Sequence, residues 1–96
     1  MATQLFLNRG FSDINPLEFG EEKCAPNHEY GPNYRSYYLI HYVASGKGVF
    51  ECEGKRFELF SGDAFIIEPN KIVHYMADEK DPWHYIWIGF TAQIKL

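Results

Sequence analysis

Four histidines are the residues in this sequence best suited to metal binding or acid–base chemistry: His28, His41, His74 and His84. Zinc sites in proteins take three or four side-chain ligands that converge on one point. The histidines here are spread along the chain, and no two of them form a His-x-His pair. We therefore expect no metal site, and for His74 we favour a structural hydrogen bond at the start of a strand.

Nucleophilic and acid–base catalysis also lack a sequence signal. Cys24 and Cys52 do not form a Cys-x-x-Cys pair and are too few for a disulfide scaffold. Cys52 lies on the same face of its expected strand as Phe50, which favours packing over reactivity. No nucleophile elbow is present, and the carboxylate pairs Glu21–Glu22 and Asp78–Glu79 lie in charged stretches that we expect to be solvated. The sequence therefore predicts a protein that is not an enzyme and needs no cofactor.

The strongest chemical signal is the aromatic stretch 83–90. Alternation with a period of two places Trp83, Tyr85 and Trp87 on one face of a strand, and His84, Ile86, Ile88 and Phe90 on the other. Two apolar faces indicate a strand that is covered on both sides. Aromatic rings with hydroxyl or indole donors suit a small polar ligand with an apolar face, such as a sugar ring. The same rings could instead fill the core, as most aromatic side chains do.

Other residues could join this interior. Tyr38 and Tyr75 are candidates from neighbouring strands. Arg35, flanked by Tyr34 and Tyr37, could donate hydrogen bonds to a ligand hydroxyl or carboxylate, or lie on the surface. The candidate ligand-binding residues are thus Arg35, Tyr38, Tyr75, Tyr85 and Trp87.

The elements that would position these side chains are strands. With 96 residues the chain is long enough for one domain, and its hydrophobic content of 46% and aromatic content of 18% favour a pleated, half-buried architecture. Turn residues recur about every 8–12 positions, which is typical of a sandwich or barrel. The sequence predicts an all-β fold with extended segments at 34–44, 49–53, 56–60, 64–67, 73–76 and 83–90, and loops at 9–16 and 25–33.

Charge and hydropathy exclude several classes of protein. The net charge is -4 with no basic cluster, which does not suit a nucleic-acid-binding surface. No apolar run approaches the length of about 18 residues that a membrane span requires, and no secretion signal is present at the N-terminus. We expect a cytoplasmic protein that does not bind a membrane.

Two sets of motifs carry a family resemblance. The segment from Gly62–Asp63 through Pro69 to a following histidine resembles the second motif of the cupin β-barrel. Taken in order over about residues 7–90, a longer series resembles the N-terminal effector-binding domain of AraC-family transcriptional regulators: Cys24-x-Pro26-x-His28-x-Tyr30-Gly-Pro32-x-x-Arg35, Tyr38-Leu-Ile-His-Tyr-Val43, Gly46-Lys-Gly48, Gly62-Asp63, Pro69, Tyr75-x-Ala-Asp78 and Asp81-Pro-Trp83-x-Tyr-x-Trp87-Ile-Gly-Phe90.

The resemblance implies a cupin-like double-stranded β-helix, or jelly-roll barrel, at residues 17–96, with an N-terminal arm at residues 1–16 over the pocket. It implies a small-molecule effector, commonly a sugar, a homodimer, and DNA binding only through a C-terminal domain outside these 96 residues. Tyr75 and Trp87 match a pocket tyrosine and a ring-stacking tryptophan of the family's arabinose-sensing prototype. Tyr85 stands where that prototype has a histidine, so a different effector is expected.

Two alternatives stay open from the sequence. One is a metal-dependent cupin enzyme, such as a sugar isomerase or dioxygenase, although the missing His-x-His pair disfavours it. The other is a module that only dimerises and whose barrel is filled by its own side chains. A cavity between aromatic residues 75, 85 and 87 would distinguish the sensor from the filled barrel.

Overall fold

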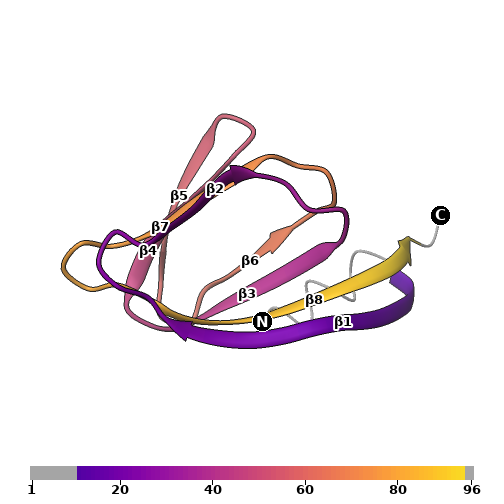
Figure 1. Ribbon diagram of the computed structural model, residues 1–96, viewed down its shortest axis with the longest axis horizontal. Coiled ribbons are helices and arrows are strands. Elements are labelled where there is room, and N and C mark those ends of the chain that lie inside the picture. The colour runs from indigo at the N-terminus through magenta and orange to yellow at the C-terminus, as the bar shows by residue number, and fades with distance from the viewer. Residues whose placement is uncertain (1–10, 95–96) are drawn as a thin grey trace.

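The computed structural model describes residues 11–94, and every regular element in that range is a β-strand, as the sequence predicted (Figure 1). No helix in this range is long and apolar enough to cross a membrane. The strands are β1 (Phe11–Lys23), β2 (Glu29–Asn33), β3 (Tyr38–Ser45), β4 (Lys47–Cys52), β5 (Lys55–Phe60), β6 (Ala64–Ile67), β7 (Val73–Ala77) and β8 (His84–Ile94).

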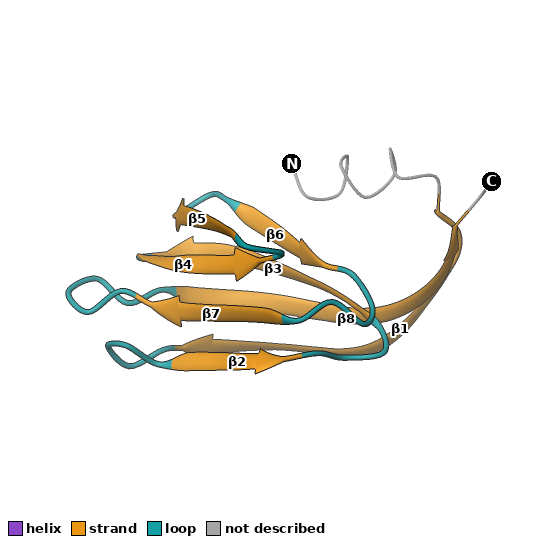
Figure 2. Ribbon diagram, turned by 90° about the horizontal axis from the view of Figure 1, so that it is seen from above, coloured by secondary structure: helices purple, strands orange, loops and turns teal. Residues whose placement is uncertain are grey.

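The strands form two antiparallel sheets that face each other. One sheet has the order β1-β8-β3-β6 and the other the order β2-β7-β4-β5. Apart from the hairpin β4–β5, each successive strand lies in the opposite sheet, so the chain winds back and forth around a shared interior (Figure 2). This is the predicted double-stranded β-helix, in which inward-facing side chains of both sheets build the core.

Two turns show why particular residues are needed. Gly46 alone separates β3 from β4, a tighter connection than the four-residue turn that the sequence suggested. It has a φ of 75°, and a Cβ atom there would lie 2.5 Å from the carbonyl oxygen of Pro82. Asn70 has a φ of 63° in the loop after β6, directly after Pro69. Glycine and asparagine adopt such left-handed conformations at the lowest cost.

Three boundaries differ from the sequence prediction. Residues 11–16, expected as part of an arm or loop, form the first half of β1, whose backbone pairs with β8 as far as Phe11 opposite Ile94. Pro16 is tolerated because β1 is an edge strand, where a missing N–H leaves no gap in the ladder. Residues 29–33, expected as loop, form β2, whereas residues 34–37 precede β3 instead of belonging to it. The remainder of the expected arm, residues 1–10, lies outside the described residues.

The core lies between the sheets. Trp83 and Tyr85 are buried there and Trp87 packs against them, which confirms the predicted inward face of the last strand. The other face of β8 is less covered than expected, because Ile86 and Ile88 are 40% and 48% exposed. One face of β8, which carries Tyr85 and Trp87, is therefore covered both by the other sheet and by the interior.

Candidate ligand-binding cavity

A cavity of about 320 Å³ lies between the two sheets. Four of the five predicted ligand-binding residues line it: Arg35, Tyr75, Tyr85 and Trp87. The volume is near the lower end of the ~300–1,000 Å³ typical of small-molecule pockets, and its combination of rings with a few polar groups is what such pockets use. The barrel is therefore not completely filled by its own side chains.

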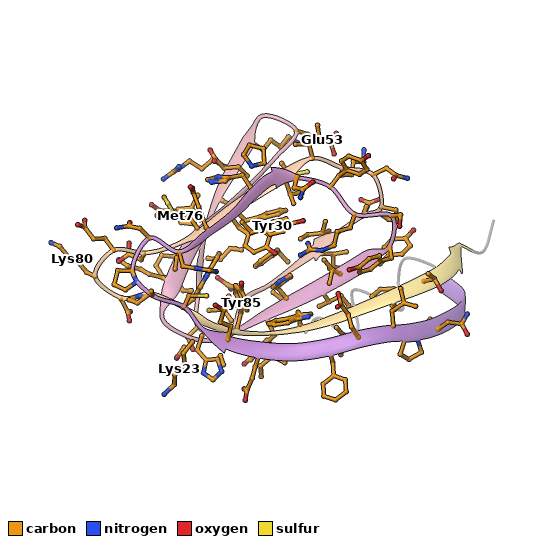
Figure 3. The ribbon with its side chains drawn as sticks, viewed as in Figure 1. Lys23, Tyr30, Glu53, Met76, Lys80 and Tyr85 are labelled. Atoms are coloured by element: carbon orange, nitrogen blue, oxygen red, sulfur yellow. The ribbon has the colours of Figure 1, made fainter. Side chains whose placement is uncertain are left out.

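Strand register brings these residues together from both sheets. On β8, Tyr85 and Trp87 point inward, and Trp87 lies opposite His41 of β3. On the other sheet, Tyr75 of β7 lies opposite Tyr30 of β2, and their rings stack with centroids 5.0 Å apart. Figure 3 shows Tyr30 and Tyr85 between the two sheets, one reaching from each side.

His41 is the most deeply placed polar side chain of the cavity wall. It is 2% exposed, and its ring stacks on Phe65 at 4.7 Å and meets the edge of Tyr85 at 4.8 Å. Its Nε2 atom lies 3.5 Å from the Tyr75 hydroxyl, whereas Nδ1 has no hydrogen-bond partner. Burial first, and the nearby positive charge of Arg35 second, lower the pKa of His41 to about 3. The imidazole is therefore neutral at ordinary pH.

Arg35 supplies a positive charge to the same cavity. Its guanidinium lies 4.1 Å from the centroid of the Tyr30 ring, within the range of a cation–π contact. Burial acts to lower its pKa, but a hydrogen bond to the Tyr75 hydroxyl and the neighbouring phenol groups leave the pKa above its usual value. Its Nη1 atom is buried without a hydrogen-bond partner. Arg35 forms no ion pair with a carboxylate among residues 11–94.

Two tyrosine hydroxyls complete the polar lining. Burial raises the pKa of Tyr75 to about 12, against the opposing effect of Arg35. Burial also raises the pKa of Tyr85, whose hydroxyl contacts the thiol of Cys24. The same burial raises the pKa of Cys24, so the thiol stays protonated and unreactive. Both phenols are therefore neutral groups that can donate and accept hydrogen bonds.

Acidic residues from β1 and β2 also line this cavity. Glu22 pairs with His28 at 3.5 Å, and Glu29 binds Nε2 of His74 at 2.8 Å. Within the described residues, Glu22, Cys24 and His28 form the one group of metal-ligating types whose ligand atoms all lie within 4.8 Å of one another. The contact between Glu22 and His28 and the contact of Cys24 with Tyr85 give these side chains partners without an ion.

Tyr38, the fifth predicted residue, does not line the cavity. It points to the opposite face of β3, where its ring stacks on Phe90 at 5.3 Å and 7°. Placing Tyr38 in the same interior as Tyr75 was wrong, because Leu39, His41 and Val43 occupy the inward positions of that strand. The expectation for His74 is confirmed: its ring bonds to Glu51 and Glu29 and joins β7 to both of its neighbours.

Sequence reasoning missed six of the lining residues, which are Glu22, His28, Glu29, Tyr30, Leu39 and His41. Two of them, His41 and Tyr30, contribute rings to the wall beside the predicted tyrosines. His41 could have been found from register, since an inward-facing Trp87 requires its partner on β3 to face inward too. The sequence offered little indication that Tyr30 faces the interior, because the following Gly31-Pro32 is typical of a loop.

The chain is similar to a known family of ligand-binding domains and to parts of two bacterial operon regulators. The family described as the AraC-like ligand binding domain matches residues 15–94. The raffinose operon transcriptional regulatory protein of Pediococcus pentosaceus is 42% identical over 91 residues, and the match covers 93% of this chain and 32% of that protein. The Msm operon regulatory protein of Streptococcus mutans is 37% identical over 80 residues, covering 83% and 29%. The chain thus spans about a third of the length of these relatives.

Solved structures support the fold. A cupin superfamily protein from Desulfitobacterium hafniense aligns with a TM-score of 0.64 at 10% identity, covering 77% of this chain and 78% of that one. The polyketide cyclase RemF from Streptomyces resistomycificus aligns with a TM-score of 0.70 at 15% identity, covering 79% and 55%. At this level of identity the likeness concerns architecture alone, since one fold hosts many functions.

Proposed function

The chain belongs to the family of AraC-like ligand-binding domains, and from that premise we propose that its effector is a small carbohydrate held inside the barrel. The observation that carries the proposal is the cavity of about 320 Å³, walled by Trp87 and by the polar groups of Arg35, His41 and Tyr75. An indole face can cover the apolar side of a sugar ring while the polar groups bind its hydroxyls. The names of two relatives, which regulate the raffinose and Msm operons, agree with this proposal.

The remaining parts of the proposal concern the longer protein. The relatives extend well beyond the matched third, and we assign DNA binding to a helix-turn-helix domain that follows the barrel. Occupancy of the cavity would bias two arrangements of a homodimer, which requires the sugar to bind one arrangement more tightly than the other. The N-terminal arm, expected at residues 1–16, would act on the pocket. A protein that regulates an operon would act in the cytoplasm, and the domain itself would catalyse no reaction.

The two alternative functions are weaker. A module that only dimerises would need no internal space, yet a cavity is present beside Trp87. A metal-dependent enzyme would need converging ligands that are free to hold an ion, whereas Glu22 and His28 contact each other at 3.5 Å and Cys24 contacts the Tyr85 hydroxyl.

Calorimetric titration with raffinose, galactose, glucose, sucrose and arabinose tests the proposal. We expect at least one of these sugars to bind, and we expect Tyr75→Phe to weaken its binding several-fold by removing a hydroxyl from the cavity wall. Tyr42→Phe is the matched control, because Tyr42 lies on the outer face of β3 and is 42% exposed. Absence of binding across the panel, or equal effects of the two substitutions, would contradict the proposal.

A further inference from the structure

Two nitrogen atoms in the cavity wall have no hydrogen-bond partner: Nη1 of Arg35 and Nδ1 of His41. The His41 side chain is 98% buried (2% exposed), so bulk water does not serve as its partner. An unsatisfied buried polar group costs roughly 1–3 kcal/mol, and native proteins retain few of them without a reason. Both residues line the same cavity, so a ligand bound there would lie beside both side chains and would become the partner of these atoms after a small side-chain rotation.

The hydrogen-bond chain around Tyr75 indicates which of the two His41 nitrogens carries a hydrogen. A guanidinium has only donors, so the Tyr75 oxygen accepts the hydrogen bond from Arg35. The hydroxyl hydrogen of Tyr75 is then free to point at Nε2 of His41, 3.5 Å away. If Nε2 accepts, the single hydrogen of a neutral imidazole is on Nδ1. Both unpartnered atoms are then N–H donors, and each belongs to a residue that contacts the Tyr75 hydroxyl.

We propose that the effector presents two acceptor oxygens on neighbouring carbons, one to Nη1–H of Arg35 and one to Nδ1–H of His41, so that His41 determines specificity for a vicinal diol of a neutral sugar ring. This proposal rests on the proposed function and names the chemistry of that same site. The proposal favours a neutral diol over a sugar carboxylate. Glu22 and Glu29 also line the cavity, and their carboxylates would repel a carboxylate on the ligand. An amino group at either position would bring a donor opposite the N–H group of Arg35 or His41.

Deoxy sugars test which oxygens the wall binds. Galactose and glucose are compared with their 2-, 3-, 4- and 6-deoxy forms, with galactosamine and with galacturonate, by calorimetry on the full chain. We expect two adjacent positions at which removal of the oxygen weakens binding about tenfold or more, since a site built around a hydroxyl strongly rejects an analogue that lacks it. Binding of galacturonate that is tenfold tighter than that of galactose would overturn the choice of a neutral diol.

Two substitutions of His41 then separate a direct contact from a structural role. His41→Gln places an amide near the position of Nε2 and leaves the position of Nδ1 empty. His41→Asn places an amide N–H near the position of Nδ1. We expect the glutamine variant to lose about tenfold in affinity together with the sensitivity to one of the two deoxy positions, and the asparagine variant to recover most of the loss. Thermal unfolding of both variants checks that the barrel is intact.

The tautomer can be measured without any ligand. Long-range ¹H–¹⁵N spectra of the imidazole in the wild-type chain distinguish a hydrogen on Nδ1 from one on Nε2, and we expect the Nδ1–H form. An Nε2–H form overturns the inference even if the variants do not fold. A sugar that binds the wild type and both His41 variants equally, yet is weakened by Tyr75→Phe, overturns this inference alone. Absence of sugar binding by the wild type overturns both this inference and the proposed function.

Discussion

Gly20 on β1 lies opposite Trp87 on β8, and a Cβ atom on Gly20 would lie 2.5 Å from Cζ2 of the indole ring. Gly20 thus leaves the space that the ring occupies at the cavity wall. We predict that Gly20→Ala displaces the indole, destabilises the barrel by about 1–3 kcal/mol as other overpacking substitutions do, and weakens sugar binding. Chemical denaturation and calorimetry measure the two effects.

The control for this prediction is a double-mutant cycle with Trp87→Phe, whose smaller ring leaves room beside residue 20. If the clash with the indole is the cause, Gly20→Ala costs less stability in that background. Equal costs in both backgrounds would show that the clash with the indole is not the cause of the lost stability.

The face of the last strand was predictable from sequence, whereas the face of β3 was not. The sequence indicated which face of the last strand points inward, because that face carries large aromatic side chains, those of Trp83, Tyr85 and Trp87. The other face carries the smaller Ile86 and Ile88. On β3 both faces are apolar. Tyr38 is buried on one side against Phe90, and Leu39 is buried on the other. Alternation alone does not decide between two such faces, and only the register with β8 does so.

The edge strands were missed for a related reason. Residues 11–16 and 29–33 contain turn-forming residues that read as loops. Their pairing with β8 and β7 supplies backbone hydrogen bonds that override these local preferences. Such long-range pairing is not visible in a short window of sequence, and for this reason Tyr30 was not among the predicted site residues.

Tyr30 is predicted to orient Arg35. Its ring stacks on Tyr75 and lies under the guanidinium at 4.1 Å. Because a cation–π contact contributes roughly 0.5–2 kcal/mol, we expect Tyr30→Leu to weaken sugar binding by about 2- to 30-fold. Tyr30→Phe keeps the ring and is the matched control. A larger loss in the phenylalanine variant than in the leucine variant would show that the hydroxyl, and not the ring, is what matters.

His74 is predicted to make stability depend on pH on the alkaline side. Hydrogen bonds to Glu29 and then to Glu51 raise its pKa in the folded chain, since both ring nitrogens can donate only when the imidazole is protonated. The stabilisation is fully present below the unfolded-state pKa of about 6.5 and is lost as the pH rises through the folded-state pKa. Urea denaturation between pH 5.5 and pH 9 should show this decline.

Two variants test the origin of the alkaline decline. His74→Gln should flatten it, because a neutral amide does not titrate. His84→Gln is the matched control, since the His84 ring bonds to a single carboxylate, that of Glu21 at 3.0 Å. If the decline persists in the His74 variant and disappears in the His84 variant, its cause is His84 of β8 and not His74 of β7.

His41 is predicted to make stability depend on pH on the acidic side, with the opposite sign. Its pKa is about 3 in the folded chain and about 6.5 when unfolded, so between these values the unfolded chain binds a proton that the folded chain does not. The contribution of His41 to stability is therefore complete above pH 6.5 and falls as the pH drops, with a slope of up to about 1.4 kcal/mol per pH unit for one proton.

Urea denaturation from pH 7 to pH 4 measures this slope. His41→Gln should reduce the slope, and His74→Gln should leave it in place. The groups that face the ring, Phe65, Tyr75, Tyr85 and Trp87, carry no charge in this range, and Arg35 stays positive throughout. A slope that is unchanged in His41→Gln would therefore mean that the imidazole is not held neutral, and that water reaches the wall of the cavity in the absence of a ligand.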